Sequence, residues 1–197
     1  MEIYINNKKY NAVDNETIIQ VADRHEIHIP RFCYHKRLSI VASCRMCLVE
    51  VEGAKYPQPA CSTLVRDGMK INTSGSITED AQKSTMEFLL INHPLDCPIC
   101  DQAGECELQD VSLEHGDYKS SYKEMKRTVI DNDIGNLIST EMTRCIHCSR
   151  CVRFGEEVAG MKELGMTGRG ENTKIETFVN ESLSSELSGN VIDLCPV

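Results

Sequence analysis

The sequence predicts an α+β fold in three parts, and two observations lead to this prediction. Eleven cysteines fall into three separate groups along the 197 residues. Around the first group, apolar and polar residues alternate as in strands, whereas the stretch that follows has the apolar spacing of a helix. We therefore expect three domains, each built around one cysteine group, at residues 1–75, 76–135 and 136–197.

Residues 1–75 show the pattern of a small sheet with one helix. "EIYINNKKYNAV" alternates apolar and polar residues around "NNKK", which indicates a hairpin with Asn in its turn. "DNETIIQVADRHEI" follows, with helical spacing of Ile18, Ile19 and Ala22 behind a cap at Asp14 or Asn15. "CLVEVEG" and "MKINT" alternate again as strands. This order of elements predicts a β-grasp domain.

The middle part, residues 76–135, contains one clear helical pattern. "TEDAQKSTMEFLLI", residues 78–91, predicts a helix that begins near Thr78. Glu79 and Asp80 then lie in its first turn, where acidic side chains interact favourably with the helix dipole. This helix leads to His93, and we expect the rest of the segment to be irregular and polar.

Composition limits the classes of partner. Lys and Arg number 21 and Asp and Glu 30, so the net charge is −9 and nothing offers a basic excess for nucleic acid. No apolar run reaches the 18 or more residues of a membrane span. The start "MEIYINNKKY" resembles neither a signal peptide nor a transit peptide. We expect a soluble, unexported chain with protein or small-molecule partners.

The cysteines favour metal binding over disulfides. An odd number leaves one thiol unpaired, and disulfides are rare in reducing compartments. With His93, the eleven cysteines make twelve ligands, or three sets of four. The groups are Cys33, Cys44, Cys47 and Cys61; Cys97, Cys100 and Cys106; and Cys145, Cys148, Cys151 and the distant Cys195.

The first group has the spacing C-x10-C-x2-C-x13-C. One close pair with two outlying cysteines is typical of a loop around a [2Fe–2S] cluster, although the plant-type pattern has x4 in the first gap. A structural zinc site would favour paired C-x2-C knuckles. Arg45, between two of these cysteines, either offsets thiolate charge or lies in solvent.

The third group, "CIHCSRC", matches the C-x2-C-x2-C run of bacterial [4Fe–4S] ferredoxins. In that pattern a fourth cysteine follows after x3 and binds the other cluster, but here the position is Gly155. Cys195, followed by Pro, resembles the end of a second run whose other members fall on Val191, Ser188 and Ser185. We therefore expect a degenerate bacterial-ferredoxin-like domain that keeps one [4Fe–4S] cluster and has lost the ligands of the other.

Charged residues flank this run. Arg144, Arg150 and Arg153 either compensate cluster charge or occupy the surface, and His147, between two ligands, is interpreted as a bystander.

His93 is the ambiguous ligand. A lone histidine before Pro94 is usually hydrogen-bonded or solvated. The middle group has only three cysteines, however, and His93 stands four positions before Cys97, so counting favours ligation. A neutral imidazole would make a cluster less negative and easier to reduce, other factors being equal.

The order of the three groups carries a resemblance to a known family. "SCRMCLVEVEG", "HPLDCPICDQAGECELQD" and "TRCIHCSRCVRF" resemble signature segments in the N-terminal iron–sulfur region of the large, 75 kDa-type subunit of respiratory complex I, NADH:quinone oxidoreductase. The resemblance covers essentially the whole chain. It implies three ligand sets: Cys33, Cys44, Cys47 and Cys61 for one [2Fe–2S] cluster; His93, Cys97, Cys100 and Cys106 for a [4Fe–4S] cluster; and Cys145, Cys148, Cys151 and Cys195 for a second [4Fe–4S] cluster.

The resemblance also implies electron transfer as the function. Electrons would arrive from a flavoprotein subunit that binds FMN and NADH, since this chain lacks a Gly-rich dinucleotide fingerprint. They would leave towards a ferredoxin-like two-cluster subunit of the peripheral arm and finally quinone. The chain would then be an enzyme only as part of a proton-translocating NADH dehydrogenase, with no catalytic residue of its own. It would lie on the cytoplasmic side of the bacterial inner membrane, or the matrix side in mitochondria, attached through partner subunits.

Other functions remain open at this point. Chains of this family continue into a large domain resembling molybdopterin oxidoreductases, so this chain is either a fragment or a short form. The diaphorase small subunit of NAD-reducing hydrogenases resembles the same region and is naturally short. Iron-only hydrogenases and formate dehydrogenases carry a similar module but usually keep the second ferredoxin cluster. A zinc-bound interaction scaffold would be colourless and redox-silent.

Overall fold

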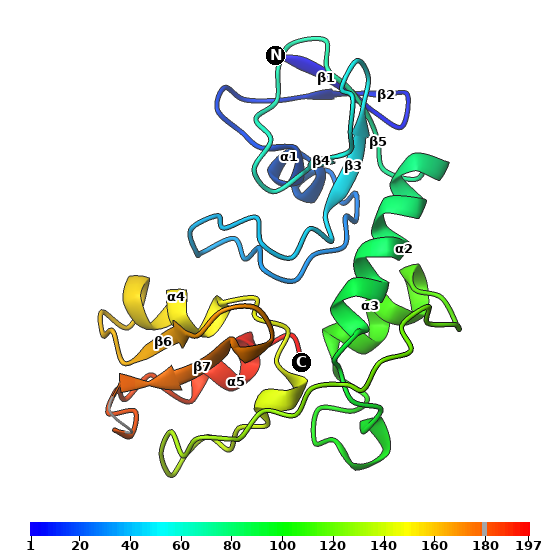
Figure 1. Cartoon of the computed structure of the whole chain (residues 1–197). Helices are drawn as coiled ribbons and strands as arrows, with labels where there is room; N and C mark the ends of the chain where they lie inside the picture. The colour runs from blue at the N-terminus through cyan, green and yellow to red at the C-terminus, as the bar shows by residue number, and fades with distance from the viewer. Residues whose placement is uncertain (179–180) are drawn as a thin grey trace. The chain divides into compact units, whose positions relative to one another are not determined.

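The structure, a computed structural model, describes residues 1–178 and 181–197 and divides into two compact units (Figure 1). Unit 1 contains the N-terminal sheet and unit 2 contains the C-terminal elements. Unit 1 comprises Met1–Tyr34, Ile40–Phe88 and Val111–Tyr118, and unit 2 comprises His35–Ser39, Leu89–Asp110 and Lys119–Val197.

Unit 1 is built on a five-stranded mixed sheet with the order β2-β1-β5-β3-β4. The central pair, β1 and β5, is parallel, and the other pairs are antiparallel. The strands are β1 (Glu2–Ile5), β2 (Lys8–Asn11), β3 (Leu48–Val51), β4 (Gln58–Pro59) and β5 (Lys70–Asn72). The predicted β-grasp domain is confirmed, and β4 is a short strand that the sequence pattern did not indicate.

The first hairpin forms as predicted. Asn6 and Asn7 join β1 to β2 with φ values of 50° and 64°. Positive φ at both central residues is the requirement of a type I′ turn, which Asn meets more easily than most residues. The turn therefore sets the register in which Ile3 pairs with Tyr10.

Helix α1 (Ile18–Arg24) packs under this sheet, but its predicted cap is wrong. The cap residue is Thr17, not Asp14 or Asn15. The Thr17 backbone N–H donates to the Gln20 side-chain oxygen at 2.8 Å, which satisfies one of the free groups at the helix start.

The core of unit 1 contains two of the first-group cysteines. Ile3 and Ile5 of β1 are fully buried, as are Ile18 and Ile19 of α1. Cys47 and Cys61 belong to the same apolar cluster. Residues of the sheet and of helix α1 therefore pack in one cluster with these two cysteines.

Helix α2 (Ser76–Leu90) begins two residues before the predicted start. Thr78 is buried inside it, where its hydroxyl donates to the Asn72 carbonyl at 2.8 Å and accepts from the Glu50 N–H at 3.1 Å. Gln82, one turn on, donates to the Leu48 carbonyl. These bonds tie the start of α2 to strands β3 and β5.

The middle segment is less irregular than predicted, because it contains helix α3 (Glu107–His115). Only Leu108 and Val111 of this helix are buried apolar residues, so its sequence has little helical periodicity. The irregular assignment is therefore wrong for these residues. A short 3-10 turn, η1 (Cys97–Ile99), precedes it.

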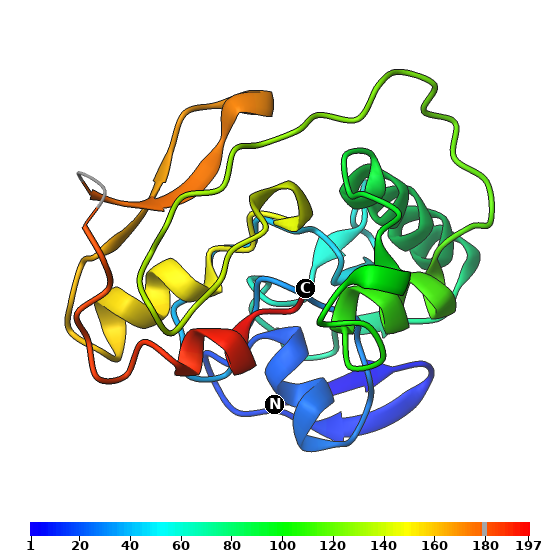
Figure 2. The same ribbon diagram turned by 90° about the horizontal axis from the view of Figure 1, so that it is seen from below.

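Unit 2 contains helix α4, the hairpin β6–β7 and helix α5 (Figure 2). Helix α4 packs against α5 and β6. The elements are α4 (Arg150–Glu157), β6 (Leu164–Thr167), β7 (Lys174–Thr177) and α5 (Asn190–Leu194), with 3-10 turns η2 (Met142–Arg144) and η3 (Gly170–Asn172). Within the described part of the chain, no helix has both the length and the apolarity needed to cross a membrane.

Candidate metal centres

The four cysteines of the first group meet in unit 1. All four are buried. The Cys33 backbone N–H lies 3.4 Å from the Cys44 sulfur. The Cys33 thiol is also hydrogen-bonded to Cys44 and Cys61, and Cys47 is hydrogen-bonded to Cys61. Four sulfur donors therefore face one another.

These contacts polarise the thiols. Hydrogen bonds from Cys44 and Cys61 lower the pKa of Cys33, and a bond from Cys61 lowers the pKa of Cys47. The thiols that donate these bonds, Cys44 and Cys61, have a raised pKa because the bonds favour their protonated form. Thiolates are the form that binds iron, so the site already favours charge on two of its donors. Arg45 is exposed, so of its two interpretations the solvated one fits.

The second group surrounds a small cavity in unit 2. His93 and the three cysteines all line it. Cys97 in η1 is exposed, whereas Cys100 and Cys106 are half-buried. The four residues that counting grouped together therefore line one cavity.

His93 is held in one tautomer. Its Nδ1 lies 3.0 Å from the Arg144 backbone carbonyl, which can only accept, so Nδ1 carries the proton and Nε2 keeps a free lone pair. Burial lowers the pKa of His93, and the nearby charges of Lys126 and Arg144 act in the same direction. The imidazole is therefore neutral, which is the form required of a metal ligand.

The third group lies around a larger cavity of about 230 Å³, also in unit 2. Cys145, Cys151 and Cys195 line it, and Cys148 is buried outside the lining. Burial raises the pKa of both Cys148 and Cys151 to about 12, so as free thiols they stay protonated. The structure thus brings the distant Cys195 to the cysteine run.

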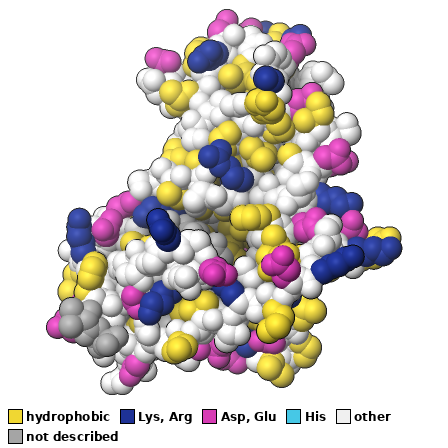
Figure 3. All heavy atoms as spheres, viewed as in Figure 1, with side chains coloured by type: hydrophobic (Ala, Val, Ile, Leu, Met, Phe, Trp, Pro, Cys, Tyr) yellow, Lys and Arg dark blue, Asp and Glu magenta, His cyan; other side chains and the backbone are white. Residues whose placement is uncertain are grey.

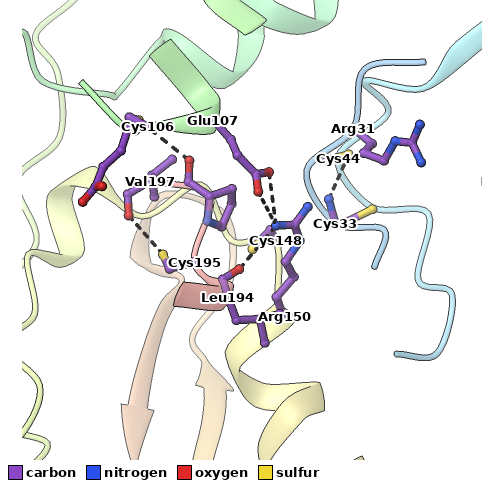
Figure 4. Close-up of polar contacts among 12 residues, drawn as sticks. Arg31, Cys33, Cys44, Cys106, Glu107, Cys148, Arg150, Leu194, Cys195 and Val197 are labelled. Atoms are coloured by element: carbon purple, nitrogen blue, oxygen red, sulfur yellow. Dashed lines mark hydrogen bonds and ion pairs between the residues drawn. The ribbon is translucent and has the colours of Figure 1, made fainter. Parts of the chain in front are cut away.

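Two of the flanking arginines are buried, so the surface interpretation is wrong for them. Arg150 donates to both carboxylate oxygens of Glu107 at 3.2 Å and to the Leu194 carbonyl at 3.3 Å (Figure 4). Arg153 donates to the carbonyls of Ser39 and Cys148.

Arg144 is the third of these arginines, and it pairs with Asp96 at 3.5 Å. Elsewhere charges of both signs are interspersed on the face seen in Figure 3. Arg150 and Arg153 differ from the charged residues of this face in being buried.

The positions of the lost ferredoxin ligands also share one cavity. It is small, about 20 Å³, with walls that include Phe154 and Leu183. A side-chain Cβ at residue 155 would lie 3.0 Å from the Met161 carbonyl oxygen, so a cysteine there would be crowded. Gly155, Ser185, Ser188 and Val191 all line this cavity.

The donor sets fit iron–sulfur clusters in their chemistry. Clusters take cysteine thiolates, with histidine as a known replacement. All eleven cysteines are free thiols. Among residues 1–178 and 181–197 no three His, Cys, Asp or Glu side chains are grouped to hold a single metal ion.

Two cations that touch these sites were not singled out from the sequence. Lys126 contacts the backbone of His93, and Arg127 contacts His147. His147 Nε2 donates to the Thr173 carbonyl at 2.9 Å, and its interpretation as a bystander to ligation stays a prediction. The only feature of the sequence that could have drawn attention to Lys126 and Arg127 is that the two cations are adjacent in a polar segment.

Three family models match consecutive parts of the chain. Residues 1–76 match a 2Fe-2S iron-sulfur cluster binding domain. Residues 82–120 match the NADH-ubiquinone oxidoreductase-G iron-sulfur binding region. Residues 135–197 match the ferredoxin-like domain of NADH-quinone oxidoreductase subunit 3. Iron–sulfur binding is thus shown for the domain types, without the number of clusters.

Curated relatives are similar over the whole chain. The NADH-ubiquinone oxidoreductase 75 kDa subunit of Reclinomonas americana is 51% identical over 197 residues. The chain belongs to the family of the 75 kDa subunit. The iron-sulfur protein 1 of NADH dehydrogenase from Solanum tuberosum, a mitochondrial protein, is also 51% identical. A 78 kDa mitochondrial subunit from Neurospora crassa is 50% identical. The chain spans 27–28% of the length of these 75 kDa-type relatives.

A solved structure has the same fold. It is a chain from an NAD+-reducing [NiFe]-hydrogenase in the H2-reduced state, with a TM-score of 0.74 and 22% identity. The match covers 95% of this chain and 78% of that chain. At this identity the likeness supports the α+β architecture alone.

Proposed function

We propose that this chain is the iron–sulfur electron-transfer region of a subunit of NADH:quinone oxidoreductase, complex I. It conducts single electrons from an FMN- and NADH-binding subunit through three clusters towards quinone. The observation that carries the proposal is the second centre, where His93 and three cysteines line one cavity. One imidazole and three thiols together form a four-donor set of the kind that holds an iron–sulfur cluster.

The proposed ligands are those implied by the three groups, in domains at 1–75, 76–135 and 136–197. When bound, iron–sulfur clusters supply one-electron chemistry whose potential depends on net charge, hydrogen bonds and burial. The ligand sets are Cys33, Cys44, Cys47 and Cys61 for [2Fe–2S]; His93, Cys97, Cys100 and Cys106 for [4Fe–4S]; and Cys145, Cys148, Cys151 and Cys195 for a second [4Fe–4S].

This chain's residues set the surroundings of each centre. All four cysteines of the first set are buried, and two of them belong to the apolar core, so water is largely excluded from their thiols. Arg150, buried beside the third set, is a cation that favours added negative charge. The Nδ1–H bond from His93 to the Arg144 carbonyl leaves Nε2 as the ring nitrogen with a free lone pair, on a residue that lines the second cavity.

Partners and location are part of the same proposal. The FMN/NADH flavoprotein subunit would donate electrons, and a ferredoxin-like two-cluster subunit would accept them. Family membership and the mitochondrial relatives support a peripheral position on the matrix side, or on the cytoplasmic side of a bacterial inner membrane. Contact with the membrane would occur only through other subunits.

A second candidate is the diaphorase small subunit of an NAD-reducing hydrogenase. The fold match to a chain of such a hydrogenase favours it. Sequence identity favours complex I, at 51% against 22%. Affinity purification from the native host separates them, because co-purification with quinone-reactive NADH dehydrogenase subunits supports the first and co-purification with a nickel subunit the second.

Iron analysis tests the cofactor content. Anaerobically reconstituted chain should bind ten irons, two plus four plus four, with equal sulfide, since the twelve donors form three sets of four. The control is the same reconstitution with zinc offered in equal amount. Iron near zero with zinc in its place would refute the proposal in favour of a zinc scaffold.

Substitution of His93 tests the ligand that is not a cysteine. His93→Cys should keep a four-iron cluster and lower its reduction potential, because a thiolate adds negative charge. His93→Ala should weaken or lose that cluster only. Unaltered iron content and an unchanged potential of the middle cluster in His93→Ala would show that this histidine is not a ligand.

A further inference from the structure

The segment between α3 and η2, residues 119–141, connects two of the proposed centres. It contains no helix or strand and runs as a long extended trace in Figure 2. Near its middle stand two adjacent cations, Lys126 and Arg127. Their side chains reach different partners within unit 2, which sequence position alone would not indicate.

Lys126 binds the end of α2 and the ligand segment that follows. Its ammonium donates to the Leu90 carbonyl at 2.9 Å and to the His93 carbonyl at 2.7 Å. Leu90 is the last residue of α2, where carbonyls lack helical partners and carry partial negative charge. The ammonium therefore closes the helix end and holds the His93 backbone.

The His93 side chain has a second anchor. Its Nδ1 bonds to the Arg144 carbonyl at 3.0 Å. One contact thus holds the backbone and another holds the ring, so the direction of Nε2 is set by both.

Arg127 makes backbone contacts near the third cysteine group, as Lys126 does near the second. Its guanidinium donates to the Glu171 carbonyl at 2.8 Å and to the Thr173 carbonyl at 3.4 Å. His147 Nε2 lies 2.9 Å from the same Thr173 carbonyl, so Nε2–H donates there, and Arg127, 3.3 Å from Nε2, is linked to His147 through this shared acceptor. Its backbone N–H donates to the Asn92 side-chain oxygen at 3.1 Å. The same residue therefore also holds the ligand segment beside His93.

His147 stands between two proposed ligands of the third set. It has φ of 55°, and its N–H lies 3.4 Å from the Cys145 sulfur. Arg127 therefore acts on the third set by its charge and by the Thr173 carbonyl that it shares with the His147 ring.

We propose that Lys126 and Arg127 form a two-cation strap. Lys126 positions His93 and raises the reduction potential of the second cluster. Arg127 positions His147 and raises the reduction potential of the third cluster. This inference rests on the proposed function. Successive side chains of an extended segment point to opposite sides, which lets neighbouring cations serve two centres. A nearby positive charge favours the reduced, more negative state of a cluster. Both are positioning residues, since neither would touch iron.

A crossed pair of variants in the full, anaerobically reconstituted chain tests the strap. Lys126→Met should lower the potential of the second cluster and leave the third unchanged, and Arg127→Met should do the reverse. Each variant is the matched control for the other, because both remove one charge at adjacent positions. The expected size is about a tenfold fall in the one-electron reduction constant, which is about 59 mV. Redox titration followed by electron paramagnetic resonance measures it.

Two further readouts separate positioning from folding. Lys126→Arg should restore the second potential, and the nitrogen hyperfine coupling of His93 should change in Lys126→Met alone. Loss of four irons in Lys126→Met with ten kept in Lys126→Arg would also support the strap. Loss of the irons in both, no change in either potential, or equal shifts of both clusters in each variant would overturn it. Fewer than ten irons in the unsubstituted chain would instead count against the proposed function, before any variant is compared.

Discussion

Arg150→Met is the substitution whose consequences the structure defines most fully. The Arg150 side chain is only 6% exposed and spans the gap between Glu107 on α3 and the Leu194 carbonyl at the end of α5. Methionine keeps much of the apolar stem but removes the charge and every donor. The substitution therefore tests stability and potential together.

The stability loss follows from the two partners. Glu107 is 51% exposed and can be rehydrated, so its pair contributes about 1 kcal/mol or less. The Leu194 carbonyl loses a charged donor, which costs about 1.5–3 kcal/mol. The sum, about 2–4 kcal/mol, corresponds to a fall in melting temperature of roughly 5–15 °C.

The reduction potential of the third cluster should also fall in Arg150→Met. A unit charge within about 10 Å of a cluster, at an effective dielectric constant of about 20, contributes about 1.7 kcal/mol, or about 70 mV for one electron. Arg150 lies next to the backbone that carries Cys195, so the third cluster should respond most. Arg150→Lys should keep most of the potential but less of the stability, because an ammonium is more strongly hydrated than a guanidinium and therefore costs more to bury.

Calorimetry at one fixed scan rate and anaerobic redox titration measure the two effects, the fixed rate being needed because cluster loss makes unfolding irreversible. Arg169→Met is the control, since Arg169 is exposed and carries the same charge. If Arg150→Met matched Arg169→Met in both melting temperature and potential, the reasoning about a buried compensating cation would be refuted.

Three further outcomes are expected. Cys195→Ser should remove only the third cluster, so that iron falls from ten to about six, and three unchanged paramagnetic centres would contradict the ligand assignment. Burial lowers the pKa of His115, so the unfolded chain binds the His115 proton more tightly and the stability of the fold should decline as pH drops below about 6.5. His115→Gln should flatten that decline in melting temperature between about pH 7 and pH 5.5. An equal slope in the variant and the unsubstituted chain would count against this prediction. Gly155→Ala should cost about 1–3 kcal/mol of unfolding free energy, measured by melting of the loaded chain, because its Cβ would lie 3.0 Å from the Met161 carbonyl oxygen; an unchanged melting temperature would show that the backbone yields there.

The spacing of neighbouring residues was enough for several features. Alternation in "EIYIN" and "CLVEV" predicted strands, because one face of each strand must be apolar. The paired asparagines predicted the hairpin turn, because few other residues accept positive φ. The grouping of cysteines, with His93 counted as the twelfth donor, predicted donor sets that the structure brings to common places for the first two groups.

Local sequence patterns failed to predict features of the fold that depend on contacts with other parts of the chain. Helix α3 has too few apolar positions to be periodic, and its Leu108 N–H bonds to the Pro196 carbonyl far along the chain. The cap of α1 falls at Thr17, and not at the predicted Asp14 or Asn15, because the Gln20 side chain bonds back to the Thr17 N–H.

By itself the sequence determined which residue types are available as donors and how they group along the chain, because those properties depend on residue identity and near spacing. Only the tertiary structure decided the environment of the donors. Whether an arginine is solvated or buried depends on what packs over it, and Arg45 and Arg150 have opposite outcomes although each stands between two cysteines. Cys195 joins a run of cysteines more than forty residues away because α5 packs against α4. The potentials of the proposed clusters therefore depend on buried charge that no local pattern encodes, since charge acts through space and not along the chain.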